Sequence, residues 1–344
     1  MADLQYDAVT RTFVFRDDKK GVDLTQGGHR FKAPELRALL DAEQQLHTLH
    51  APREGSVNAV TPKQEKFSAV WKKEMIKRPA EGLPGQDVLE FAGDAVLTHE
   101  QNGQALKGDR ILAWYTQKKE EASAKGAATA RTSKAKKGLN DLGAEQQFAS
   151  TVLHRVFAEG KVEVSTPEFL ARTGALDMLF AESPKPLAAA SKPASGKQRG
   201  SAAQKGQPEN LTEAIDALEE KQSKPAVRMP ALIVANKILV HLLRYRNDVM
   251  VTDVTAQEQV QLQQGRPNGE PPAVARAQQM TLVNRGEGDQ DLQFLGSPAE
   301  LSDQGSTLRG DKIFVWTKRN QALVEGPGQF LSPVKNSFDG KALK

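Results

Sequence analysis

Cysteine is absent from this 344-residue chain, which excludes disulfides and Cys-ligated metals. Aromatic residues make up only 6% and hydrophobic residues 38% of the chain, so we expect part of it to be disordered. There is no run of 18 apolar residues, and therefore no transmembrane helix is predicted. The first residues, MADLQYDAVTRTFVFRDDKK, contain neither a basic n-region nor an apolar h-region, so the sequence as given predicts no secretory signal.

The net charge of +4 is unevenly distributed. Residues 118–137 carry seven Lys or Arg and two Glu, and residues 183–228 carry eight Lys or Arg and five acidic residues. The rest of the chain is therefore net negative. Because the positive charge lies in two linker-like segments, no nucleic-acid partner is expected.

A repeated segment is the clearest feature of the sequence. Residues 89–115, LEFAGDAVLTHEQNGQALKGDRILAWY, are similar to residues 292–316, LQFLGSPAELSDQGSTLRGDKIFVW. Each copy contains Leu-x-Phe-x-Gly, then a polar turn, then Leu-Lys/Arg-Gly-Asp-Lys/Arg-Ile. Such an internal repeat indicates a duplicated supersecondary unit.

Each copy is predicted to form a β-hairpin or meander with Gly-Asp at a tight turn or bulge. The alternative is that Gly108-Asp109 and Gly310-Asp311 bind a cation or a phosphate. One carboxylate per turn is too few for calcium, and no glycine-rich phosphate motif precedes a helix. His47 and His50 lie on opposite faces if their segment is a strand, so neither a metal nor a cofactor is predicted.

Short strands separated by turns are predicted in the rest of the chain. Phe13–Phe15 and Val22–Leu24 are typical strands, and residues 35–50 fit strands better than a helix, with Pro34 where the repeat has Gly-Asp. Residues 52–86 form a mixed segment that ends in a loop at 79–85. Further strands are predicted within 153–164, 171–180, 231–234, 237–243, 249–254, 260–263, 279–283 and 323–330. This pattern favours an antiparallel all-β fold.

The predicted organisation has two β regions. Residues 1–182 form the first, with a basic insertion at 118–147, and residues 229–334 form the second, followed by a tail at 335–344. The Pro/Ala/Ser/Lys-rich segment 183–228 is predicted to be a disordered linker. Within it, Leu211, Ile215 and Leu218 share one helical face, which predicts a short amphipathic helix at 210–221 that could dock onto a partner.

Taken in order, these motifs resemble the OstA-like (organic solvent tolerance-like) domains of lipopolysaccharide-transport proteins. The residues that carry the resemblance are 91–97 with 106–111, 157–164, 235–238, and 308–313 with 324–326. The resemblance implies a repeated antiparallel open jelly roll, a folded-over sheet, in two lobes. It also implies a non-enzymatic protein of the periplasm or the outer membrane.

By this resemblance, an apolar groove binds the acyl chains of lipopolysaccharide or another envelope lipid. Sheet edges would stack onto other OstA-like proteins or onto a second copy. The groove residues predicted from the repeat are Phe91, Val96, Leu106, Ile111, Phe294, Leu308 and Ile313, with Trp114 and Trp316 near the rim. The alternative for each is ordinary core packing.

Two other functions compete with lipid transport. The first is a β-rich scaffold that assembles protein partners and binds no lipid. The second is an enzyme acting on envelope polysaccharide, which would need paired carboxylates in a cleft. Glu159 with Asp177, and Asp289 with Asp291, lie in turn-like polar contexts, so we expect no enzymatic activity and no catalytic residues.

Overall fold

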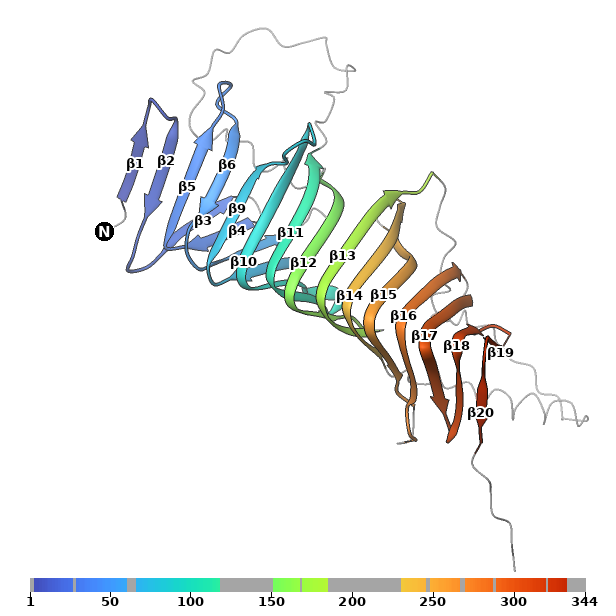
Figure 1. The fold of residues 1–344 in the computed structure, drawn as a ribbon. Helices are drawn as coiled ribbons and strands as arrows, with labels where there is room; N and C mark the ends of the chain where they lie inside the picture. The colour runs from blue at the N-terminus through green and yellow to red at the C-terminus, as the bar shows by residue number, and fades with distance from the viewer. Residues whose placement is uncertain are drawn as a thin grey trace, which may run out of the picture.

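The computed structural model describes residues 3–26, 29–60, 66–117, 151–167, 169–184, 230–245, 248–266, 270–286, 289–319 and 321–332. These residues form one open 20-stranded sheet whose strands lie across the long axis of the molecule (Figure 1). In the described part of the chain, the only helical element is the one-turn 3₁₀ helix η1 (Glu100–Asn102). The prediction of an all-β, mainly antiparallel fold is confirmed.

Long strands form the central and C-terminal parts of the sheet. They are β10 (Gln86–His99), β11 (Gln104–Gln117), β12 (Thr151–Ser165), β13 (Phe169–Glu182), β14 (Ala231–Tyr245), β15 (Asp248–Gln264), β16 (Ala273–Gly286), β17 (Asp289–Asp303) and β18 (Ser306–Trp316). Neighbours pair antiparallel in sequence order, except that β13 and β14 are parallel.

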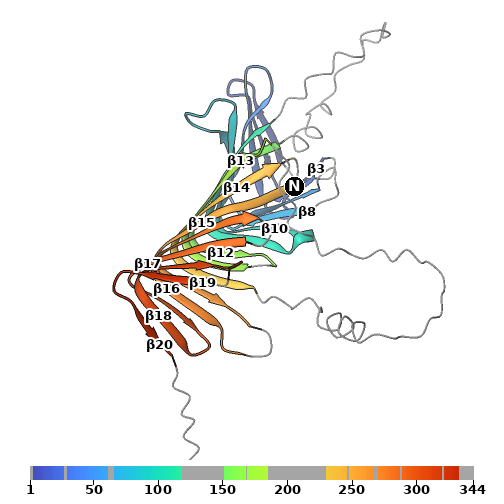
Figure 2. The ribbon, with the colours of Figure 1, turned by 90° about the vertical axis from the view of Figure 1, so that its right-hand side faces the viewer.

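A row of β-bulges crosses these strands near their middles. The register shifts between Ala92 and Ala95 in β10, and corresponding shifts follow from β11 through β17. Bulges bend and twist a strand. Here they turn every long strand at the same level, and we call this line the corner (Figure 2).

The corner divides the sheet into two arms. Arm A contains residues 86–92 of β10 and everything paired with them, and arm B contains residues 95–99 of β10 and everything paired with them. Trp71 in arm B lies 5.6 Å from Phe91 in arm A, measured between ring centroids. The two arms therefore pack against each other through one face of the sheet, the inner face, and turn the opposite, outer face away.

In the N-terminal region the chain crosses the corner with separate short strands. Arm A contains β1 (Asp3–Asp7), β2 (Thr12–Arg16), β5 (Glu35–Leu40), β6 (Leu46–Ala51) and β9 (Glu74–Pro79). Arm B contains β3 (Val22–Gln26), β4 (His29–Ala33), β7 (Gly55–Val60) and β8 (Lys66–Trp71). Pro34 separates β4 from β5, at the position predicted from the repeat, because proline has no N–H to donate to a ladder.

The C-terminal end is built in the same way. β19 (Gln321–Glu325) pairs with β18 in arm A, and β20 (Gln329–Leu331) pairs with β18 in arm B. Residues 326–328 cross the corner between them. Gly326 has a φ of +87°, a conformation that glycine adopts without steric cost.

Most predicted strands are confirmed, with two differences. Sequence reasoning missed β1 and β4, and also β7, β8 and β9, which occupy the segment interpreted as mixed. It also divided β14 and β15 into two strands each, because polar residues at the corner interrupt their apolar alternation. The predicted basic insertion, the linker with its helix except for Ser183 and Pro184, and the tail from residue 335 lie outside the described residues.

Candidate functional site

The inner face carries one continuous apolar cluster that crosses the sheet from β4 to β18. Residues near the corner are fully buried, such as Ile111, Ala158 and Met280 at 0% exposure. Farther along the arms the inner residues are only partly buried, among them Leu153, Phe180 and Leu242. Burial therefore decreases from the corner toward the strand ends. The two arms are packed most tightly at the corner, and their inner side chains become more exposed with distance from it.

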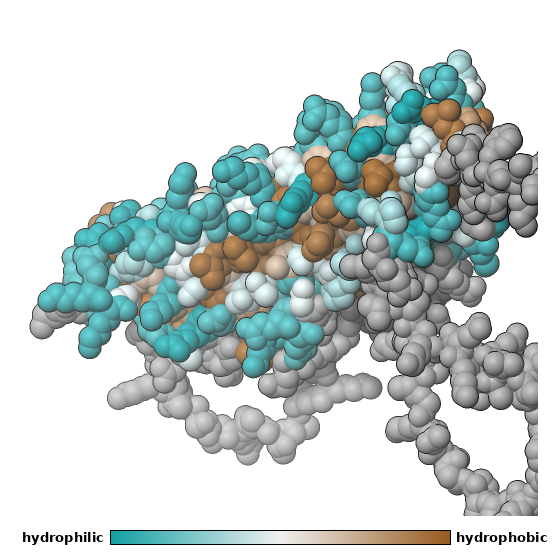
Figure 3. Space-filling model, turned by 90° about the horizontal axis from the view of Figure 1, so that it is seen from below, coloured by the Kyte–Doolittle hydropathy of each residue, from teal (hydrophilic) through white to brown (hydrophobic). Residues whose placement is uncertain are grey.

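The apolar inner face continues to both ends of the sheet. Tyr6 in β1 stacks on Phe13 at 4.4 Å between ring centroids and remains 54% exposed. At the other end, Phe330 in β20 lies opposite the inner residue Leu308 and is 66% exposed. Figure 3 shows apolar side chains in a band along the long axis, between two hydrophilic margins.

Six of the predicted groove residues lie on the inner face. Phe91, Leu106, Ile111, Phe294 and Ile313 are buried members of the apolar cluster, and Leu308 packs against it. The five buried residues lie toward the corner, where they form the floor between the arms. The partly exposed positions, including Leu308, are the ones that a bound molecule could contact.

Val96 lies on the outer face, contrary to prediction. Ala95 is fully buried on the inner face, so its neighbour Val96 points the other way, opposite Val70. The repeat contains the signal that could have shown this. Ala95 corresponds to Ala299 in the second copy, and Val96 then corresponds to Glu300, a charged residue unsuited to an apolar face.

Trp114 and Trp316 also lie on the outer face and do not form the rim of a groove. Each is three residues after a buried inner isoleucine, Ile111 or Ile313, and an odd separation along a regular strand reverses the face. Trp114 packs with a small outer cluster of Ala80, Val88, Leu112 and Phe157. Trp316 stacks on Phe314, with 5.9 Å between ring centroids.

Trp71 is the inner-face tryptophan, and sequence reasoning did not select it. It is 1% exposed, lies between Phe31 and Phe91, and donates a 2.8 Å hydrogen bond from Nε1 to the carbonyl oxygen of Arg53. The alternation of Phe67, Ala69 and Trp71 could have revealed both the strand and its buried face. Its ring packs directly on Gly55, where a side chain would clash with it.

An ion pair lies on the inner face of arm A. Lys77 Nζ is 3.1 Å from Asp87 Oδ2 and also donates to the carbonyl oxygen of Leu46 at 3.3 Å. Tyr115 lies opposite Asp87 in the ladder. Burial, together with the negative charge of Asp87, raises the pKa of the Tyr115 hydroxyl far above its usual value. These polar side chains lie on the inner face of arm A, away from the corner.

The outer face, by contrast, carries paired charges. Arg110 donates to Glu90 at 2.6 Å and to Glu159 at 3.3 Å, and its hydrogen bond to Glu90 raises the pKa of the guanidinium. Arg155 forms a bidentate pair with Asp177 and lies 5.1 Å from the Trp114 ring centroid. Glu159 and Asp177 therefore serve in structural ion pairs, each bound by an arginine.

The Gly-Asp motifs lie at the corner, as the bulge interpretation predicted. A Cβ atom at Gly160 would lie 2.7 Å from Asp109 Cβ, and one at Gly326 would lie 3.3 Å from Asp311 Cβ. Each aspartate thus packs against a glycine on the adjacent strand or turn. Across the described ranges, no group of three or more His, Asp or Glu residues could hold a metal ion.

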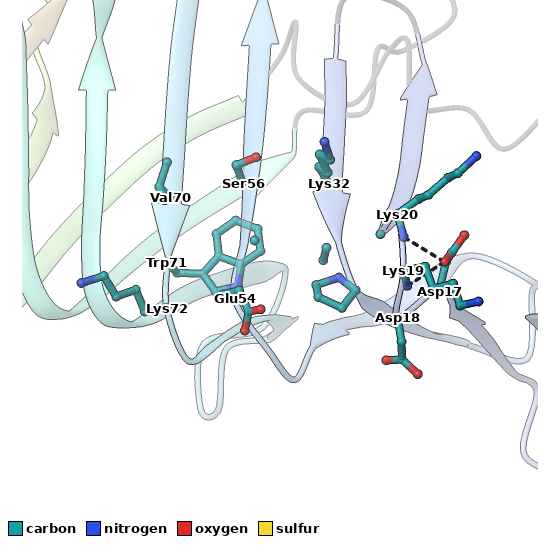
Figure 4. A pocket seen from close by; sticks show the side chains of 14 residues that line it. Asp17, Asp18, Lys19, Lys20, Lys32, Glu54, Ser56, Val70, Trp71 and Lys72 are labelled. Atoms are coloured by element: carbon teal, nitrogen blue, oxygen red, sulfur yellow. Dashed lines mark hydrogen bonds between the residues drawn. The ribbon is translucent and has the colours of Figure 1, made fainter. Parts of the chain in front are cut away.

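A shallow depression of about 490 Å³ lies at the corner of the N-terminal region (Figure 4). Lysines and acidic residues both line it, and most of the acids are already engaged. Asp17 accepts 3.0 Å hydrogen bonds from the backbone N–H groups of Lys19 and Lys20, which lower its pKa, and Asp18 pairs with Arg53 at 2.7 Å. These contacts hold the turn together, and the depression is less suited to a ligand than the inner face.

Among the described residues, there is no helix with the length and apolarity needed to cross a membrane. Comparison of the sequence with protein-family models gave no match. Searches of the curated proteins and of the solved structures also found no significant match. The resemblance to OstA-like domains therefore rests on the motifs of this chain alone.

Proposed function

We propose that this protein is a non-enzymatic envelope protein that binds lipid acyl chains between its arms, as its resemblance to lipopolysaccharide-transport proteins implies. The observation that carries the proposal is the apolar inner face, which is only partly buried away from the corner and continues to both ends of the sheet. Burial of hydrocarbon contributes about 0.8 kcal/mol per methylene group. An acyl chain along this face therefore binds without any specific polar contact.

The proposal extends to architecture and assembly. Residues 1–182 and 229–334 are then two lobes of a repeated open jelly roll, and the repeated Gly-Asp corner contacts support this. β1 and β3 at one end, and β19 and β20 at the other, each have a single described neighbour. Such edges can pair with a second copy or with another OstA-like protein and lengthen the apolar face. The proposed site of action is the periplasm or the outer membrane.

Photocrosslinking at two adjacent residues tests lipid binding. Leu97 lies on the inner face and Val96 on the outer face of the same strand, so p-benzoylphenylalanine at each position samples opposite faces with matched surroundings. We expect radiolabelled lipopolysaccharide to crosslink at position 97 and not at position 96. Leu308 on the inner face and Leu323 on the outer face provide a second matched pair.

Equal crosslinking at both faces would contradict a lipid site between the arms. Crosslinking to proteins alone, with no lipid at position 97 or 308, would instead support the second candidate, a β-rich scaffold. The exposed apolar residues at the sheet ends favour that alternative, because they suit a protein partner as well as a lipid.

A further inference from the structure

The junction between β13 and β14 differs from every other contact between neighbouring long strands. It is parallel, with 13 registered residue pairs from Phe169↔Ala231 to Glu182↔Arg244. The neighbouring long-strand pairs are antiparallel, and no other described strand of residues 3–182 pairs with a strand of residues 231–331. The whole association of the two β regions within the sheet therefore depends on this junction.

The connection across the junction does not fix the pairing. Residues 183–230 join the end of β13 to the start of β14, and these two points lie at opposite ends of a parallel pair. A tight turn sets the register of an antiparallel hairpin, but a connection of this length sets none. The register must come from the strands themselves.

Side chains on both strands are complementary. Leu176 and Ile238 are opposite each other on the inner face and each is 2% exposed, and Ala171 meets Ile233 in the same way. At the corner the strands approach so closely that a Cβ atom at Gly174 would lie 3.0 Å from the carbonyl oxygen of Asn236. The β13–β14 junction therefore combines buried apolar side chains with a close backbone approach, as a specific interface does.

We propose that β13 and β14 are the complementary edges of two separable folding units, β1–β13 and β14–β20, and that the β14–β20 unit of a second copy can take the place of the one in the same chain. Joining the two units within one chain gives the intramolecular partner an effective concentration on the order of millimolar. The closed monomer is therefore favoured in dilute solution. Exchange of an identical unit between copies makes the same contacts and needs no new surface.

Cleavage of the full-length protein tests this proposal. A protease site inserted after Gly200 allows the folded chain to be cut, and the two fragments should still co-elute in size-exclusion chromatography. When cut protein carrying an affinity tag is mixed with cut untagged protein, fragments should exchange and mixed complexes should form. In a Trp114→Phe, Trp316→Phe background, the fluorescence of Trp71 reports throughout whether the first unit remains folded, because Trp71 is buried in its core.

Two glycine variants make the test specific. Gly174→Val places a side chain at the β13–β14 junction, and Gly108→Val places one 3.3 Å from the carbonyl oxygen of Glu159, between β11 and β12 of the same unit. Gly174→Val should accelerate exchange by about tenfold or more, which corresponds to about 1.4 kcal/mol, while Gly108→Val should leave its rate unchanged. Exchange only after Trp71 becomes exposed, or equal acceleration by both variants, would overturn the proposal.

Discussion

Tyr115, Asp87 and Lys77 show how a single polar cluster is accommodated on an apolar face. The lysine and the aspartate neutralise each other at 3.1 Å, and the phenol stays protonated because burial and the nearby carboxylate disfavour its anion. A buried charge is stable only when it is paired. The charge of Asp87 therefore adds to burial in favouring the neutral form of Tyr115.

The Tyr115 hydroxyl should make the protein lose stability at alkaline pH. Its pKa is higher in the folded state than in the unfolded state, so its contribution is fully present below about pH 10 and decreases as the pH rises above that value. The loss should approach about 1.4 kcal/mol per pH unit. Urea unfolding of the wild type and Tyr115→Phe between pH 8 and 11.5 measures it.

We expect the stability of Tyr115→Phe to depend less steeply on pH above 10, since phenylalanine cannot ionise. The exposed Tyr6 provides the control, because Tyr6→Phe should leave the wild-type slope intact. If the slopes of wild type and Tyr115→Phe coincide, the phenol ionises as readily in the folded protein as in the unfolded chain.

At the scale of elements, the corner is the feature that shapes every long strand. It needs residues with positive φ, and several of them are not glycine, including Asp94, Lys161, Glu258 and Gln259. Positive φ at such residues carries a steric cost. That cost is offset where the bend allows the apolar inner faces of both arms to be buried together.

Gly160 is a corner position where replacement should be damaging. An alanine there would both hold a φ of +73° and collide with Asp109, whereas Gly103 has a φ of +60° with no atom within 4 Å of an added Cβ. Gly103→Ala should therefore cost about 1 kcal/mol from conformation alone, and Gly160→Ala at least about twice that. Chemical denaturation of both variants compares them directly, and equal losses would mean that the Asp109 contact relaxes without cost.

The non-glycine bulges also explain what the sequence could and could not predict. Alternation of apolar residues identified the strands within residues 153–180 and 229–331, because they bury one face. It did not predict the corner in β15, since Glu258 and Gln259 have the composition of any polar stretch. Strict alternation from Phe91 places Ala95 and Leu97 on the inner face and Val96 on the outer face, as observed, so the wrong assignment of Val96 did not come from the bulge. In β11 the strand does change face at the corner, because Leu106 and Ile111 are both inner although they are five residues apart.

For the molecule as a whole, we expect the two ends of the sheet to control association. Both ends have exposed apolar side chains beside an unpaired strand edge, as Tyr6 and Phe330 show. We expect concentration-dependent self-association in sedimentation velocity, and we expect Tyr6→Lys or Phe330→Lys to weaken it, because charge on an edge strand opposes pairing. Val9→Lys is a matched control, since Val9 is 92% exposed in a turn outside the sheet. An equal effect of Val9→Lys would show that general charge, and not the edge, controls association.

The direction of the strands has a mechanical consequence. Because the strands lie across the long axis, their hydrogen bonds point along it, with neighbouring strands about 4.8 Å apart (Figure 1). Tension between the two ends would load successive strand pairs in series, so the pair with the fewest bonds would separate first. β20 is held by three residue pairs and β1 by five, whereas 13 join β13 to β14. A pulled molecule should therefore lose its terminal strands before the two regions part, so that the ends would separate and re-form while the middle of the sheet stays intact.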